Sequence, residues 1–299
     1  MRVFVTGATG FVGSAVVREL IGAGYQVLGL SRSDAGAKFL VDAGAQVQRG
    51  DLQDLDSLRS GAAASDGVIH LAFIHDFSKY QENCEIDRRA IEVLGSALAG
   101  SGRPLIVTSG TGVVGPTPGR LATEDDAPDS GPGAIPRAAS ELTAASMAAR
   151  GVRVSVMRLP QVHDPEKQGL VAYAIAAARD KGVSAYVGDG ANRWPAVHRL
   201  DAAHLYRLVL EKGTAGARYH AVAEEGVPLR QIAEAIGRRA NIPVASISAA
   251  EAIAHFGWLG NFVAIDNASS SERTRRLMGW KPNGPRLIED IDARREAAA

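Results

Sequence analysis

Thr6–Gly13 reads TGATGFVG and decides the fold of this chain of 299 residues. The stretch follows Met1–Val5, a short apolar run with the length expected of one buried strand. Behind it, Val12, Val16 and Leu20 recur at every fourth position, which is the spacing of one face of a helix. The sequence therefore predicts a strand, a glycine-rich turn and a helix, in that order.

Each glycine of this turn has its own mechanical role in a nucleotide-binding loop. Gly7 permits the tight turn, Gly10 lets backbone N–H groups approach a pyrophosphate, and Gly13 lets the helix pack closely on the sheet. The N-terminus of the helix favours an anion. We therefore expect a dinucleotide here, with an ordinary glycine-rich turn as the alternative. The residues expected around the dinucleotide are Gly7, Thr9, Gly10, Phe11, Val12 and Gly13.

Composition limits the classes of partner. The chain carries 33 basic and 33 acidic side chains, so its zero net charge argues against nucleic acid or an anionic membrane as the main partner. No apolar run approaches the roughly 18 residues that a membrane span needs. Because Cys84 is the single cysteine and no secretory signal pattern opens the chain, we expect a cytoplasmic protein. The expected partner is a small-molecule substrate, and a homodimer is left open.

Strand-like apolar runs alternate with helix-like patterns along the first half of the chain. The runs are 25–30, 45–49, 67–72, 104–108 and 152–158. Such alternation predicts an α/β protein with a parallel, doubly wound sheet of the Rossmann type. We place this domain at residues 1–158 and a smaller C-terminal substrate lobe at 159–299, of which 194–222 is expected to pack back on the first domain.

Several motifs resemble those of one protein family. The turn has the form TGxxGxxG, and residues 68–72 read Val-Ile-His-Leu-Ala. Residues 194–201 resemble a segment that ends in H-V-x-x-D, and residues 277–282 resemble a terminal L-G-W-x-P. Over nearly its whole length the chain thus resembles the extended and atypical short-chain dehydrogenases/reductases, of the NAD-dependent epimerase/dehydratase type. The resemblance implies a nicotinamide dinucleotide as cofactor and a small carbonyl or alcohol as substrate.

The end of the second predicted strand bears on the choice between the two nicotinamide dinucleotides. An acidic residue there would bond the ribose 2′-hydroxyl of NAD, whereas Arg32 beside Ser31 suits a 2′-phosphate, so we expect NADP rather than NAD. An exposed loop arginine is the alternative. The resemblance implies further cofactor contacts at Asp51, Leu52, Leu71, Ala72, Phe73, Pro160 and Val162. For Asp51, a loop or capping carboxylate is the competing interpretation.

The chain departs from the family at the residues that usually carry the chemistry. The family has a Ser or Thr after the fifth strand and a Tyr-x-x-x-Lys on the next helix. Here Gly110 takes the place of the Ser or Thr, Arg137 that of the tyrosine and Glu141 that of the lysine. Exchanging both Arg137→Tyr and Glu141→Lys is therefore a route to the family's usual chemistry.

An arginine remains protonated at neutral pH, so Arg137 is suited to stabilising a developing alkoxide and unsuited to donating a proton. The proton then comes from His75, Thr111, His163 or water, among which a histidine is chemically the best suited. Glu141 lies four residues beyond Arg137, on the same helical face. The alternative for this pair is an exposed salt bridge, and the alternative for His75 is a polar residue in a loop.

The sequence is compatible with three functions. The first is an NADP-dependent oxidoreductase of the atypical type, acting on a small carbonyl or alcohol substrate. The second is an epimerase or dehydratase with a transient hydride transfer. The third is a non-catalytic, redox-sensing NADP-binding protein, which a site filled by Arg137 or Phe73 would favour. The long loop from Pro116 to Pro136 indicates a functional segment, and the spacing of the histidines predicts no metal site.

Overall fold

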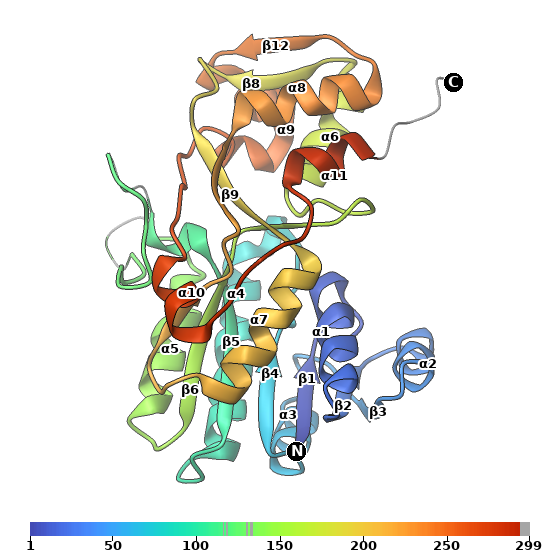
Figure 1. Cartoon of the computed structure of the whole chain (residues 1–299), viewed down its shortest axis with the longest axis vertical. Helices are drawn as coiled ribbons and strands as arrows, with labels where there is room; N and C mark the ends of the chain where they lie inside the picture. The colour runs from blue at the N-terminus through green and yellow to red at the C-terminus, as the bar shows by residue number, and fades with distance from the viewer. Residues whose placement is uncertain (116, 118, 130, 132–133, 294–299) are drawn as a thin grey trace.

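A parallel sheet of seven strands forms the centre of the computed structural model, which describes residues 1–115, 117, 119–129, 131 and 134–293 (Figure 1). The strand order is β10–β6–β5–β4–β1–β2–β3. The predicted Rossmann-type, doubly wound fold is confirmed. The strands are β1 (Arg2–Thr6), β2 (Gln26–Ser31), β3 (Gln46–Arg49), β4 (Gly67–His70), β5 (Pro104–Gly110), β6 (Arg153–Leu159) and β10 (Arg218–His220).

Helices cover both faces of this sheet, which is why its strands are apolar on both sides. Val3 and Val5 face the core beneath α1 and α7, whereas Phe4 between them faces the core beneath α3, α4 and α5. Helix α2 packs at the edge formed by β2 and β3. The helices are α1 (Phe11–Gly22), α2 (Asp34–Asp42), α3 (Leu55–Ala63), α4 (Tyr80–Leu98), α5 (Ala138–Ala148) and α7 (Arg199–Lys212).

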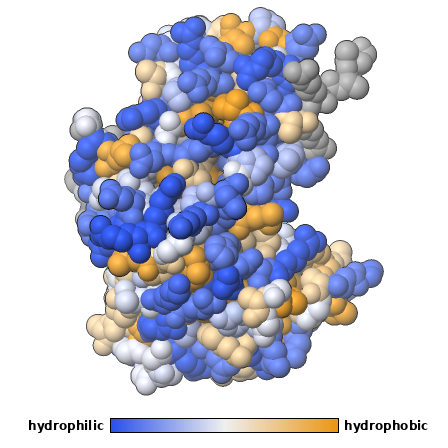
Figure 2. Space-filling view, in the orientation of Figure 1, coloured by the Kyte–Doolittle hydropathy of each residue, from blue (hydrophilic) through white to orange (hydrophobic). Residues whose placement is uncertain are grey.

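A third core lies in the C-terminal lobe, at the top of Figure 1. Strand β9 (Arg193–His198) connects the lobe to the sheet and pairs with β7 (Gln161–His163) and β11 (Glu224–Pro228). Figure 2 shows the outline of the molecule indented between this lobe and the helices α1 and α2. The lobe contains α6 (Val171–Lys181), β8 (Ser184–Val187), α8 (Leu229–Ala240), β12 (Val244–Ile247), α9 (Ala252–Phe256) and α11 (Leu287–Ala293).

The chain returns from the lobe to the central sheet between residues 199 and 220. Helix α7 packs against α1, and β10 pairs in parallel with β6 through Tyr219 and Met157. Helix α10 (Glu272–Met278) then packs against α7.

The loop expected from Pro116 to Pro136 falls partly outside the described residues. Its described part is tied to α10 and to the segment before it: Ala122 forms a bridge with Ser269, and the carboxylate of Glu124 accepts hydrogen bonds from the backbone and hydroxyl of Thr274 in α10. These contacts bring the loop after β5 next to the C-terminal part of the chain.

The strand order reverses between β1 and β4, which is where open α/β sheets hold their ligands. The loops that follow these two strands touch, since a Cβ atom built on Gly7 would lie 2.7 Å from the backbone nitrogen of Ala72. Within the described ranges, no helix has both the length and the apolar character needed to cross a membrane.

Candidate functional site

The glycine turn leaves the N-terminus of α1 open. Gly7 has φ +65°, and a Cβ atom on Gly13 would lie 2.0 Å from the Gly7 carbonyl oxygen, so packing forbids side chains at both positions. Gly10 is exposed and precedes the helix, and no side chain caps it. The first N–H groups of α1 therefore lack a side-chain acceptor and fit an anion such as a pyrophosphate.

Two cations from the second half of the chain lie over this helix end. The ammonium of Lys167 is 5.7 Å from the ring centre of Phe11, and the guanidinium of Arg199 is 5.0 Å from it. Arg199 also pairs with Asp164 at 3.1 Å. Cations gathered at the positive end of a helix are favourable where an anion binds. The sequence patterns did not predict these two residues.

The predicted 2′-phosphate site has one exposed cation. Arg32 is exposed, whereas Ser31 is buried and donates its hydroxyl to the carbonyl of Ser33 at 3.0 Å. The Ser33 hydroxyl accepts a hydrogen bond from the Gly36 N–H and so caps α2. Arg32 thus remains for a phosphate.

The residues expected beside the adenine have structural roles. One carboxylate oxygen of Asp51 accepts hydrogen bonds from the backbone of Gln53 and Asp54, as the capping interpretation proposed. Leu52 is buried and belongs to the core beneath α3 and α4.

The other residues expected to contact the cofactor lie after β4 and β6. Leu71, Ala72 and Phe73 are half-buried and follow β4, beside the glycine turn. Pro160 is also half-buried, whereas Val162 lies in β7 and packs in the core.

Arg137 is held by three groups at the carboxyl end of the sheet. Its Nη1 pairs with an Asp87 carboxylate oxygen at 2.5 Å, and its Nη2 donates to the Thr108 carbonyl oxygen at 2.7 Å. The guanidinium lies 4.2 Å from the ring centre of Phe73. The side chain is 11% exposed. Arg137 precedes α5, so the guanidinium is fixed where β5 ends.

Asp87 links Arg137 to the glycine turn through a buried hydrogen-bond network. Its other carboxylate oxygen lies 3.1 Å from His70 Nε2, and His70 Nδ1 lies 2.8 Å from the Thr6 hydroxyl. The Ser140 hydroxyl donates to Asp87 at 2.6 Å. Although burial raises the pKa of Asp87, Arg137 and His70 outweigh it and hold that pKa well below its usual range. Asp87 is therefore a buried anion that fixes the arginine.

The sequence contains an indication that Asp87 has a buried partner, although the helical pattern around Asp87 by itself indicates only core packing. Asp87 lies on the same face of α4 as Ala90, Ile91 and Leu94, all of which are buried. A charged residue within such an apolar stripe requires a buried partner. Arg137 is that partner.

Glu141 does not pair with Arg137, so the alternative interpretation of the two residues as an exposed salt bridge is wrong. Its carboxylate instead forms two hydrogen bonds of 2.8 Å with the Arg158 guanidinium, and these side chains are 1% and 0% exposed. Arg218 adds a third contact, at 3.3 Å. Arg158 at the end of β6 attracts the carboxylate into the protein, away from the guanidinium of Arg137. This arrangement indicates a structural role for Glu141.

The candidate proton donors occupy different environments. His75 is exposed, and its ring centre is 5.3 Å from that of Phe73, so it lies near Arg137. Desolvation, followed by the charges of Arg137 and Lys167, lowers the pKa of His75. Thr111 is buried and accepts a hydrogen bond from the Asn267 side chain at 3.0 Å.

His163 lies within the protein, which disfavours it as the proton donor. Its Nδ1 is 2.6 Å from an Asp290 carboxylate oxygen, and its side chain is 1% exposed. The contact joins β7 to α11.

Buried histidines make the stability depend on pH. Desolvation lowers the pKa of both His163 and His220. Below an unfolded pKa of about 6.5 the unfolded chain then binds more protons, so these histidines weaken the folded state as the pH falls. We expect the urea midpoint to be level from pH 8 to 7 and to fall at pH 5, with a smaller fall in His163→Gln. A midpoint that rises on acidification would contradict this prediction.

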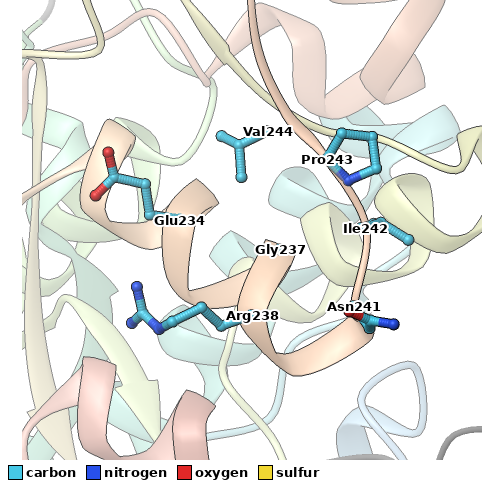
Figure 3. A pocket seen from close by; sticks show the side chains of 7 residues that line it. All are labelled: Glu234, Gly237, Arg238, Asn241, Ile242, Pro243 and Val244. Atoms are coloured by element: carbon cyan, nitrogen blue, oxygen red, sulfur yellow. The ribbon is translucent and has the colours of Figure 1, made fainter.

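Among the described residues, neither a metal-binding group nor the hollow of the lobe belongs to this site. No group of His, Cys, Asp and Glu side chains in these residues could hold a metal ion. A hollow in the lobe shares no residue with the cluster around Arg137 (Figure 3). It is lined by Glu234, Gly237, Arg238, Asn241, Ile242, Pro243 and Val244.

Comparison with known proteins agrees with this geometry. Residues 3–223 match the model of the NAD dependent epimerase/dehydratase family. An uncharacterized protein of Schizosaccharomyces pombe, C2A9.02, is 51% identical over 97% of this chain and 98% of its own length. A UDP-glucose 4-epimerase of Streptomyces lividans is 27% identical over 98% of this chain and 94% of its own.

A solved structure shares the fold. The dTDP-glucose 4,6-dehydratase DesIV of Streptomyces venezuelae, with NAD and TYD bound, superimposes with a TM-score of 0.78 at 22% identity. The match covers 98% of this chain and 95% of that chain.

Proposed function

Because this chain belongs to the NAD dependent epimerase/dehydratase family, we propose that it is an NADP-dependent oxidoreductase acting on the carbonyl or alcohol group of a small substrate. The family and its relatives include epimerases, dehydratases and reductases. The observation that carries the proposal is the guanidinium of Arg137, fixed by Asp87 and Thr108 beside the open glycine turn.

The residues of the turn fit the dinucleotide. The uncapped N-terminus of α1 would hold its pyrophosphate, with Lys167 and Arg199 above it. Leu71 and Ala72 follow β4 and would line the edge of the crevice. When bound, the nicotinamide supplies or accepts a hydride.

Arg137 would hold the substrate oxygen. Among the described residues, its Nε–H and one N–H of Nη2 have no hydrogen-bond partner, so they remain for an acceptor. A positive charge fixed in advance stabilises the oxygen anion that develops as the carbonyl is reduced. Asp87 fixes the guanidinium, and Phe73 covers one of its faces.

His75 is the group we propose for the proton. Its lowered pKa leaves it largely neutral at pH 7, which suits a base that accepts the proton of an alcohol. In the direction of reduction, its acid form becomes more abundant as the pH falls. We therefore place His75 before Thr111, whose hydroxyl is buried and bonded to Asn267.

The proposed preference for NADP rests on Arg32. We expect NADPH to bind more tightly than NADH, and Arg32→Ala to remove most of the difference, since a charge-assisted contact contributes about 1.5–3 kcal/mol. Fluorescence titration with both cofactors measures this. Equal affinities in the parent protein would exclude the proposed role of Arg32.

Lys167 is expected to contribute to binding of the pyrophosphate. Lys167→Ala should weaken NADPH and NADH alike, by about tenfold, because the lost charge faces a group that both cofactors share. The matched control is Lys181→Ala, which removes an exposed lysine of α6 and should leave both affinities unchanged. If Lys167→Ala binds both cofactors as the parent does, the lysine has no such role.

A second function is favoured by one observation. The Arg137 side chain is only 11% exposed and stacks on Phe73, so the two side chains fill part of the site. This supports a non-catalytic, redox-sensing NADP-binding protein. The sequence similarity to a UDP-glucose 4-epimerase supports a third function, that of an epimerase or dehydratase in which the hydride is transferred transiently.

An assay with a panel of aldehydes, ketones and alcohols separates these functions. An oxidoreductase changes the absorbance of NADPH in proportion to the product formed. An epimerase or dehydratase converts its substrate without net oxidation of NADPH. Tight NADPH binding without conversion of any carbonyl, sugar nucleotide or alcohol would leave the binding protein as the function.

A further inference from the structure

Five aromatic side chains form a continuous strip that joins the loop after β4 to the lobe. We define this aromatic strip as Phe73, Phe77, Tyr80, Tyr173 and Trp258. Ring centres of successive members lie 6.3 Å apart for Phe73 and Tyr80, 5.7 Å for Tyr80 and Phe77, 4.0 Å for Phe77 and Trp258, and 5.0 Å for Trp258 and Tyr173. The rings of Phe77 and Trp258 are stacked, with an angle of 11° between their planes.

The aromatic strip begins at the proposed catalytic group. Phe73 lies 4.2 Å beneath the guanidinium of Arg137, and Trp258 and Tyr173 belong to the lobe. A substrate whose oxygen is bound by Arg137 would therefore extend along these rings.

The rings of the aromatic strip keep part of their surface exposed. Tyr173 is 42% exposed, and the other four members are half-buried. Aromatic residues of the cores, such as Phe4 and Tyr206, are fully buried by contrast. Only 5% of the chain is aromatic, so a gathering of partly exposed rings at one site indicates a binding surface.

The charge of Arg137 and the charges of three arginines of the lobe are paired with carboxylates. The positive charge of Arg137 is balanced by the buried Asp87. In the lobe, the Arg193–Asp266, Arg238–Asp292 and Arg286–Glu224 pairs lie at 2.8, 2.9 and 3.0 Å. A diphosphate would have to compete with these carboxylates for its cations. A neutral substrate, by contrast, requires no free cation.

We propose that the substrate is an uncharged carbonyl compound with a flat, apolar ring next to its carbonyl group, and that this ring packs on the aromatic strip. The inference rests on the proposed oxidoreductase function and names its substrate class. Flat rings gain offset-stacked and edge-to-face contacts with such a surface that a puckered ring of the same size does not.

The test compares benzaldehyde with cyclohexanecarbaldehyde, which has the same number of carbon atoms but no flat ring. Kinetics with NADPH should give a KM for benzaldehyde that is lower by about tenfold or more. Trp258→Leu and Tyr173→Leu keep apolar bulk but remove the ring. Each should raise the KM for benzaldehyde about three- to tenfold and leave kcat and the KM for cyclohexanecarbaldehyde nearly unchanged.

Two controls make the result specific. Tyr186→Leu changes an aromatic residue of β8 that lies outside the aromatic strip and should alter neither KM. Thermal unfolding shows whether each variant is folded, and the exposed Tyr173 gives a second variant if Trp258→Leu is unstable.

The outcomes distinguish this inference from the proposed function. Equal KM values for the two aldehydes, or equal effects of the variants on both, would overturn the substrate class while the oxidoreductase stands. If no carbonyl is reduced, the proposed function fails. Saturation-transfer NMR with benzyl alcohol and the NADP complex then tests the aromatic strip directly: transfer that Trp258→Leu abolishes supports it, and absence of transfer, or tighter binding of UDP-glucose, overturns it.

Discussion

Replacing Arg137 by alanine is expected to lower kcat/KM for the carbonyl substrate by about 10²-fold or more, while the affinity for NADPH changes by less than about twofold. The guanidinium would stabilise the oxygen anion that develops in the transition state, whereas the pyrophosphate of the cofactor would be held by the N-terminus of α1. Steady-state kinetics and fluorescence titration measure the two quantities separately. Arg137→Lys should recover only part of the loss, because an ammonium cannot contact Asp87, Thr108 and the substrate in the same planar geometry.

A second variant separates this effect from a loss of stability. Arg137→Ala leaves the fully buried carboxylate of Asp87 without its cation, and breaking such a pair costs about 3–5 kcal/mol. Combining Arg137→Ala with Asp87→Asn removes both charges and should restore much of the stability without restoring turnover. If the double variant turns over substrate at the parent rate, Arg137 is structural and the site requires another assignment.

Glu141→Leu is expected to lower the free energy of unfolding by about 3–5 kcal/mol, because it leaves the guanidinium of Arg158 buried without a carboxylate. Urea unfolding followed by circular dichroism measures this change. We expect the lost stability to come from the unpaired buried charge of Arg158 and not from a change in side-chain shape. Replacing both partners with apolar residues, as Glu141→Leu with Arg158→Met, should therefore recover most of the lost stability.

An exposed pair provides the control for Glu141. Glu234 pairs with Arg230 at 3.0 Å, with side chains 41% and 59% exposed, so Glu234→Leu should change the free energy of unfolding by less than about 0.5 kcal/mol. Equal destabilisation by Glu141→Leu and Glu234→Leu would show that burial of the Glu141 pair has no energetic consequence.

The sequence predicted the parts of the fold that depend on local patterns. The run from Met1 to Val5, the glycines of the turn and the period of α1 all lie within a short stretch, and the alternation of strands and helices determined the parallel sheet. Boundaries differ only slightly: the strand expected at 25–30 is Gln26–Ser31, and the strand expected at 45–49 is Gln46–Arg49.

The candidate site depends on contacts between distant segments, which local patterns do not contain. Asp87 lies in α4 and Arg137 directly precedes α5. Lys167 reaches Phe11 from the other half of the chain, and the aromatic strip combines a loop of the first domain with the lobe. Aligning with the family identified Arg137 but gave no partner for it.

The place of Glu141 in the family motif did not predict its role in the structure. The alignment suggests Glu141→Lys as part of a return to the family's usual chemistry. In the structure that lysine would lie against the buried guanidinium of Arg158. The exchange would place two like charges together inside the protein, so we expect it to unfold the chain and not to create an active site.

The central claim is that a hydride passes to a carbonyl carbon whose oxygen is bound by Arg137. It is tested most directly with NADPH that carries deuterium at both C4 positions, the best carbonyl substrate of the panel, and mass spectrometry of the alcohol formed. The parent protein should give an alcohol with one deuterium on the former carbonyl carbon, and the Arg137→Ala, Asp87→Asn double variant should form this alcohol at least about 10²-fold more slowly. An alcohol without deuterium, or no alcohol from a parent protein that binds NADPH tightly, would contradict it.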